Sequence, residues 1–455
     1  MDVTAANTGL WSFFIHMGIL AGMLLLSNVL LRKSAFIRKS LMPTAVLAGF
    51  LLLGLKGAGL LQIPAAFLET VTYHGIAIGF IALSLRSGGE GDQSRGKGLK
   101  SGAVIIATYL MQALAGLFIS IALSYTVMPG LFKASGILLP MGYGQGPGQA
   151  NNVGGTYQAL GFAGGQSFGL SLAAAGYLCA CLVGVVYLNI LARRGRKMGR
   201  DAELLSGSVT VDTFEDKGEV PMSESVDRLS IQVALVMLTY LMTYLVTLGL
   251  TEAVAAAAPG LNAMLSPLLW GFNFITGSML ALLIRAVIKA LRKSRVMTRQ
   301  YQNNYLLSRI SGLAFDLMIV SGIAAIDFRD LAGLWLPFLL MAAAGGVTTF
   351  CFLRLLCKKV YPEYPEEAFV SMYGMLTGTI SSGVLLLRQL DPAFKTPAAN
   401  NLITGSSFGI VLGAPLLIFI GLAAKSEAML FVTLGLVAGY MALLLLFLHR
   451  GRKKA

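Results

Sequence analysis

Long apolar runs recur from one end of the chain to the other, and they constrain the fold more than any other feature. The runs at 10–31, 102–127, 165–191 and 229–250 are each long enough to cross a bilayer as one helix. Of the 455 residues, 56% are hydrophobic and only 12% are charged. Soluble globular chains carry about twice that charged share. The sequence therefore predicts an all-α polytopic membrane protein.

The remaining spans follow the same pattern, and basic residues mark alternate ends of the spans. Further spans are predicted at 41–55, 70–85, 264–291, 305–326, 334–356, 401–423 and 429–448. Because Lys and Arg concentrate in cytoplasmic loops, this pattern places the N-terminus outside and the C-terminus inside. We expect a first membrane repeat at 1–192, a cytoplasmic linker at 193–228, a second repeat at 229–423, and an additional helix with a basic tail at 424–455.

Two glycine-rich stretches interrupt the apolar pattern. In the first, at 141–165, repeated Gly residues and Pro147 disfavour a continuous helix. Irregular backbone at membrane depth is tolerated only where it packs in protein or lines a watery cavity. We therefore expect re-entrant hairpins at about 136–163 and 366–399. A polar loop outside the membrane is the alternative for the first stretch.

Short motifs recur between the two halves of the chain. Gly144-x-Gly-x-Gly148 recurs as Gly374-x-x-x-Gly378, a displacement of 374 − 144 = 230 residues. Ser167-Phe-Gly-Leu170 recurs as Ser407-Phe-Gly-Ile410, at 407 − 167 = 240. Since the first half begins outside and the second inside, the repeat is inverted. Interrupted segments at corresponding positions of inverted halves are typical of secondary transporters, whose site lies near the bilayer midplane.

The hairpin tips are the predicted binding site. Helix N-termini at a tip suit a substrate carboxylate, and unwound carbonyl groups suit Na⁺. The substrate-binding candidates there are Gly144, Gln145, Gly146, Gly148, Gln149, Asn151, Asn152, Thr377, Gly378, Thr379, Ser381 and Ser382. For the hydroxyl side chains, capping a helix or bonding to local backbone is the alternative.

Charged residues near the second stretch supply further candidates. Arg388 can hold a carboxylate with two parallel hydrogen bonds. The alternatives are pairing with Asp391 one turn later and a position among the lipid headgroups. Asp316 lies within an apolar run, where an acid is costly and suggests Na⁺ binding or proton transfer. Compensation of Asp316 by Arg309 or by water is the alternative. The remaining ion-coupling candidates are Ser167 and Ser407.

At Gly144-Gln-Gly-Pro-Gly148, at the helix 165–184 and from 315 to 413, the chain resembles the bacterial sodium/glutamate symporters. The resemblance covers most of the chain. It implies two inverted five-helix repeats with re-entrant segments, sodium-driven uptake, an elevator motion and residence in the bacterial cytoplasmic membrane. A homodimer is also an expectation of the family. Gln145 stands where the family pattern carries His, and Leu376 replaces a Gly.

These observations together predict a secondary active transporter that couples Na⁺ to uptake of glutamate or a related small carboxylate. The alternatives are a transporter coupled to H⁺, a transporter for a different organic anion or amino acid, and an ion channel. The channel is included because Gly-rich loops also build ion-selectivity filters. The sequence contains no HExxH or GxxxxGK[ST] motif, so we expect neither an enzyme nor an ATP-driven pump, and no cofactor besides Na⁺. The net charge is +14, and the Lys and Arg residues that produce it cluster at the ends of the predicted spans, beside lipid headgroups. We therefore expect no nucleic-acid partner.

Overall fold

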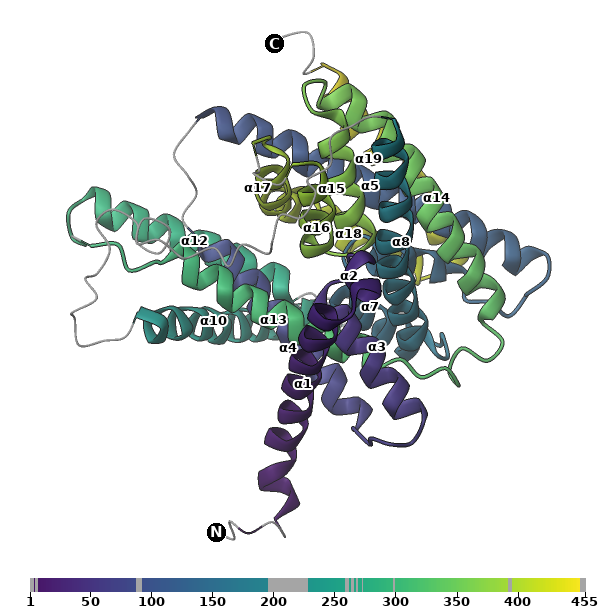
Figure 1. Cartoon of the computed structure of the whole chain (residues 1–455), viewed down its shortest axis with the longest axis horizontal. Helices are drawn as coiled ribbons and strands as arrows, with labels where there is room; N and C mark the ends of the chain where they lie inside the picture. The colour runs from purple at the N-terminus through teal and green to yellow at the C-terminus, as the bar shows by residue number, and fades with distance from the viewer. Residues whose placement is uncertain are drawn as a thin grey trace. The chain divides into compact units, whose positions relative to one another are not determined.

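The chain is an all-α polytopic membrane protein (Figure 1). The computed structural model describes residues 4, 7–86, 92–194, 228–257, 262, 266, 269–271, 273–297, 299–391 and 395–450. The first half forms α1 (Thr8–Lys33), α2 (Ala35–Lys39), α3 (Thr44–Gly57), α4 (Ala65–Leu85), α5 (Asp92–Tyr125), η1 (Lys133–Ile137), α6 (Leu138–Tyr143), α7 (Pro147–Ala159) and α8 (Gly165–Arg193). The second half forms α10 (Arg228–Ala257), α12 (Asn273–Lys293), α13 (Asn304–Ala324), α14 (Trp335–Val360), α15 (Pro365–Thr377), α16 (Ile380–Leu390), α17 (Ala398–Leu412), α18 (Ala414–Ala423) and α19 (Glu427–Arg450).

Within the described ranges, nine helices are long and apolar enough to cross a membrane, namely α1, α4, α5, α8, α10, α12, α13, α14 and α19. The span predicted at 401–423 consists of two helices, α17 and α18, which together are long and apolar enough to cross a membrane but are bent by 54° where they meet. The bend has a local cause, because Pro415 lies in the first turn of α18 and cannot donate a backbone hydrogen bond. Helix α3 is shorter than the roughly 20 residues of a full span, with 14.

Helix α10 shows how the sequence suits a lipid environment. Its buried residues include Gln232, Thr239, Thr243 and Thr247, whereas large apolar side chains such as Leu241 are exposed. A soluble protein shows the reverse pattern, with the apolar stripe of each helix facing the core. In a bilayer the apolar outer face meets lipid, and small or polar residues mediate helix packing.

The described contacts divide the chain into two compact units, and each unit takes helices from both halves. The first comprises Met1–Tyr73, Gly96–Arg200 and Leu317–Ala455, and the second comprises His74–Arg95 and Asp201–Asp316. The first unit contains both predicted hairpins. The linker predicted at 193–228 falls almost wholly outside the described residues, as does the end of the basic tail at 451–455.

In the first unit, α3 packs against the end of α13. A Cβ on Gly49 would lie 2.8 Å from the Cβ of Ile323, so the two helices approach closely there. Further along α3, the Lys56 ammonium donates to the carbonyl oxygens of Ala324 at 2.8 Å and Ile326 at 3.5 Å. A cation at this position satisfies carbonyls that have no partner within the helix and complements the negative end of its dipole.

In the second unit, α12 packs against the end of α4 in the same way. A Cβ on Gly277 would lie 2.7 Å from the Cδ1 of Ile81. Further along α12, the Arg285 guanidinium donates to the carbonyl oxygens of Arg86 at 2.9 Å and Ser84 at 3.5 Å. Gly277 follows Gly49 by 277 − 49 = 228 residues, and Arg285 follows Lys56 by 285 − 56 = 229. In the predicted inverted repeat α12 corresponds to α3 and α4 corresponds to α13, so the two contacts join equivalent helix pairs.

Candidate functional site

The first predicted hairpin has two helical arms, one formed by η1 and α6 and the other by α7. The arms are separated by Gly144, Gln145 and Gly146, and Gly146 adopts the left-handed φ of +86° that glycine tolerates. The far ends of the arms return to each other, because the rings of Phe132 and Tyr157 lie 5.2 Å apart. The tip is therefore at 144–146, within the stretch that the sequence singled out.

The second hairpin is formed by α15 and α16, with its tip at Gly378 and Thr379. The arms pack antiparallel, since a Cβ on Gly374 would lie 2.8 Å from the Cα of Gly383. The motif match had aligned Gly374 with Gly144. In the structure Gly374 lies inside α15, four residues before the tip, where it allows the arms to approach.

The two tips lie against each other beside α8. A Cβ on Gly176 of α8 would overlap the carbonyl oxygen of Thr377 and lie 3.4 Å from the Cα of Tyr143. A Cβ on Gly146 would lie 4.0 Å from the carbonyl oxygen of Gly378. The end of α6, the end of α15 and the start of α7 therefore meet at one place, and Gly176 is required there for the close approach.

A buried amide on α5 connects the two tips. The Nε2 of Gln112 donates to the Oγ1 of Thr349 and to the carbonyl oxygen of Leu376, both at 2.9 Å. On the other side, a Cβ on Gly144 would lie 2.8 Å from the Oε1 of Gln112. Sequence reasoning missed Gln112 and Thr349, because it searched the glycine-rich stretches and the charged residues. An uncharged amide in the middle of an apolar span was the available signal.

The polar side chains of the first hairpin separate into two groups. Gln149 is 1% exposed, and neither atom of its amide group has a hydrogen-bond partner among the described residues. Gln145 is half-buried at the tip itself. By contrast, the Oδ1 of Asn151 accepts a hydrogen bond from the Nε2 of Gln166 at 2.8 Å, and the Asn152 carbonyl accepts one from a nearby threonine. Gln145 and Gln149 are thus more available to a ligand than Asn151.

The hydroxyl side chains of the second hairpin mostly bond locally. The Oγ1 of Thr377 donates to the carbonyl oxygen of Tyr373 at 2.7 Å. Thr379 is the N-cap of α16, and its Oγ1 accepts from the backbone N–H of Ser382 at 3.4 Å. The side chain of Ser381 lies outside what the structure describes. For Thr377 and Thr379 the local role that the sequence left open is therefore observed.

Arg388 lies at the far end of α16 from the tip. Its side chain is exposed, and it follows Thr379 by nine residues, which is about 13 Å along a helix. Asp391 accepts hydrogen bonds from the backbone N–H of Lys395 at 2.9 Å and of Thr396 at 2.7 Å, and from the Thr396 hydroxyl at 2.7 Å. Burial alone would raise the pKa of Asp391, but these hydrogen bonds and the Lys395 charge hold the pKa below its ordinary value. Asp391 thus organises the turn after α16.

The ion-coupling candidates lie on three different helices, α13, α8 and α17. Asp316 is half-buried in the middle of α13, at the end of the second unit, and the Arg309 guanidinium lies 4.9 Å from the Tyr305 ring centre. In the first unit, the hydroxyl of Ser167 donates to the Oδ2 of Asp330 at 2.8 Å. Ser407 is half-buried on α17. Ser167 precedes Gly176 by nine residues on α8, so it fixes the loop before α14 and does not reach the tips.

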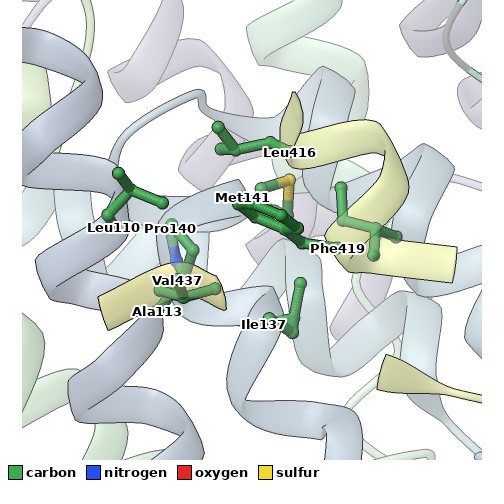
Figure 2. Close-up of a pocket in the computed structure, with 9 residues that line it drawn as sticks. Leu110, Ala113, Ile137, Pro140, Met141, Leu416, Phe419 and Val437 are labelled. Carbon is green, nitrogen blue, oxygen red and sulfur yellow. The ribbon is translucent and has the colours of Figure 1, made fainter. Parts of the chain in front are cut away.

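A small apolar cavity of about 10 Å³ lies behind the first hairpin. Figure 2 shows Pro140 and Met141 of α6 beside Leu416 and Phe419 of α18, and the other lining residues are Leu110, Ala113, Ile137, Ile420 and Val437. Its volume is near the minimum that one water requires, and its walls offer no polar partners. This cavity belongs to the packing of the hairpin and does not suit a polar substrate.

The described residues contain no group of three or more His, Cys, Asp or Glu side chains that could hold a metal ion. The four cysteines are free thiols. No family model matches the chain, and no curated protein shows significant similarity to it.

Proposed function

We propose that this protein is a secondary active transporter, related to the bacterial sodium/glutamate symporters, that couples Na⁺ to uptake of glutamate or a similar small carboxylate. One observation carries the proposal. Two helical hairpins, one from each half of a polytopic chain, bring their tips together at Gly176 of α8. Broken helices that meet in this way are the usual binding sites of secondary transporters.

The tips supply both kinds of group that such a substrate and ion need. Helices α7 and α16 begin at the tips, and their free N–H groups carry the partial positive charge that favours a carboxylate. Helices α6 and α15 end there, and their last carbonyl groups favour a cation. Both sets of groups are brought to one place by the contact at Gly176.

The polar side chains at this place are uncharged amides. Gln112 and Gln149 are fully buried, and Gln145 is half-buried. Arg388 lies at the opposite end of α16 and is exposed, so we assign recognition of the carboxylate to the helix N-termini and the amides. In this proposal the substrate and the ion bind together and favour one conformational state, since a ligand shifts an equilibrium only by its different affinities for the two states. The motion is elevator-like, in a bacterial cytoplasmic membrane.

Uptake of radiolabelled glutamate into proteoliposomes tests the proposal. We expect accumulation above equilibrium with an inward Na⁺ gradient, saturation with substrate, and no accumulation when choline replaces Na⁺. Accumulation driven by a pH gradient alone would show that the coupling ion is H⁺ and not Na⁺. Flux that never exceeds equilibrium and does not saturate would contradict a transporter and favour a channel.

A further inference from the structure

Gln112 has more hydrogen-bonding capacity than the protein uses. Its side chain is fully buried on α5, and both N–H bonds of its amide are occupied, one by Thr349 and one by the carbonyl oxygen of Leu376. Its Oε1 atom has no hydrogen-bond partner among the described residues. Burying a carbonyl oxygen without a partner is unfavourable, because the oxygen loses its hydrogen bonds to water and gains none in return. A second function for this amide would explain why that cost is tolerated.

The position of the Oε1 atom identifies that function. The Nε2 atom of Gln112 donates to Thr349 on α14 and to Leu376 on α15. The Oε1 atom therefore points away from α14 and α15, toward the first tip. A Cβ on Gly144 would lie 2.8 Å from it. The nearby backbone N–H groups of Gly144 and Gln145 already donate to the carbonyl oxygen of Pro140, at 3.0 and 3.1 Å. The first tip therefore leaves this acceptor without a donor from the protein.

The surroundings of the Oε1 atom favour a positive charge. The last carbonyl groups of α15 approach the same place, with the Leu376 oxygen bound to Gln112 and the Thr377 oxygen against Gly176. The end of a helix carries a partial negative charge, about half an elementary charge for a long helix. The residues that make these contacts, including Tyr109 and Tyr143, are all uncharged. An orphaned amide oxygen beside a helix C-terminus is suited to a cationic ligand.

From this geometry we infer that the Oε1 of Gln112 accepts a cationic group of the ligand between the two hairpin tips. The group is either the coupling Na⁺ or the ammonium of an amino-acid substrate, which share a positive charge that seeks an oxygen. The inference rests on the proposed transport function and adds to it a binding residue outside the hairpins. The same amide donates to the carbonyl oxygen of Leu376 at the end of α15. A ligand bound at its oxygen would therefore contact the first tip while Gln112 holds the second.

The test measures equilibrium binding to purified full-length protein in detergent. Gln112→Leu removes the amide at nearly constant volume, whereas Gln112→Glu keeps an oxygen in place. Gln232→Leu is the matched control, because Gln232 is also a buried amide of a long helix, 1% exposed, but bonds to Tyr301 and Asn303 in the second unit. Three ligands are titrated: NaCl against choline chloride, L-glutamate at fixed Na⁺, and glutarate, which lacks the ammonium.

We expect Gln112→Leu to lower the affinity for one cationic ligand at least tenfold relative to both the wild type and Gln232→Leu. Gln112→Glu should recover part of that affinity. A loss confined to Na⁺ identifies the ion. A loss for glutamate but not for glutarate identifies the ammonium. Unchanged affinity for Na⁺ and glutamate in Gln112→Leu, with a wild type that binds both, would overturn the inference and leave the transporter standing. A wild type that binds neither and accumulates nothing in proteoliposomes would overturn both.

Discussion

The two hairpins are anchored at their bases by the same three kinds of side chain, a tyrosine, a cation and a glutamate, but in different surroundings. At the base of the second hairpin, Arg354 of α14 pairs with Glu366 of α15 at 2.7 Å, and Tyr187 of α8 donates to the same carboxylate oxygen at 2.5 Å. The two charged side chains are 21% and 15% exposed. This cluster ties three helices together in a largely dehydrated position.

At the base of the first hairpin, Lys133 of η1 pairs with Glu427 of α19 at 2.9 Å, and Tyr125 of α5 donates to the same carboxylate. Here the charged side chains are 28% and 53% exposed. One partner comes from α19, the helix that lies beyond the two predicted repeats. The chemistry is nearly the same as in the second cluster, so burial is what should separate the two energetically.

The largest effect is expected for Arg354→Met, which leaves the Glu366 carboxylate largely dehydrated and without its cationic partner. Breaking a buried pair from one side costs about 3–5 kcal/mol. We expect a loss of that size in the free energy of unfolding, measured by reversible denaturation in mixed micelles. The double variant Arg354→Met/Glu366→Gln should recover part of the loss, and a single-variant loss below about 1 kcal/mol would remove the difference between the two bases.

Tyr187→Phe tests the hydroxyl of the second cluster separately. It removes one charge-assisted hydrogen bond to Glu366 while keeping the ring, which stacks edge-on against Phe369 at 4.8 Å. We expect a loss of about 1.5–2 kcal/mol, since bonds to charged groups contribute roughly 1.5–3 kcal/mol. The matched change Tyr125→Phe should cost clearly less in the same assay. Equal losses would show that burial does not distinguish the two clusters.

Asp391→Asn extends the comparison to the turn after the second hairpin. Asn retains one acceptor oxygen and the volume, so we expect a loss of about 1 kcal/mol in unfolding free energy. The hydrogen bonds lower the pKa of Asp391 in the folded state. The stabilisation is therefore fully present above the unfolded pKa of about 4 and is lost as the pH falls through the lower, folded value. A difference between the two proteins that grew on acidification would contradict this role.

Lys133→Met should have the smallest effect. Its partner Glu427 is more than half exposed, and exposed ion pairs contribute roughly 0.2–1 kcal/mol and are screened by salt. We expect a loss below about 1 kcal/mol that shrinks further between 50 and 500 mM NaCl. The Arg354→Met loss should change much less with salt, and a salt-independent loss for Lys133→Met would place this pair in the same class as the buried one.

Much of the fold was predictable, because apolar length and glycine content act locally. The apolar runs predicted the membrane helices, and the break at 144–146 falls within the glycine-rich stretch 141–165 that the sequence singled out. The bend in the span predicted at 401–423 was not anticipated, although one proline in the apolar run, Pro415, was its available signal. The second tip was harder to place by motif, since Gly374 allows helix packing and Gly378 forms the turn.

The candidate site was only partly predictable, because its contacts join residues far apart in the sequence. The hairpin residues lie in recognisable glycine-rich stretches, but Gln112 and Thr349 lie in plain apolar spans and meet across 237 residues. Arg388 was singled out for its chemistry, and the length of α16 then places it away from the tip. Residue type suggested which groups can bind a ligand, whereas helix length and packing decided which of them reach the site.

The most direct test of a ligand site between the two tips is chemical protection of the first tip. Gln145→Cys is introduced into a chain whose four native cysteines are replaced, with Lys425→Cys as an exposed control. The labelling rate by a thiol reagent is measured with and without saturating Na⁺ and glutamate. The proposal predicts that the ligands slow labelling at position 145 at least fivefold and leave position 425 unchanged. Equal rates at position 145 with and without ligands would contradict a site between the tips.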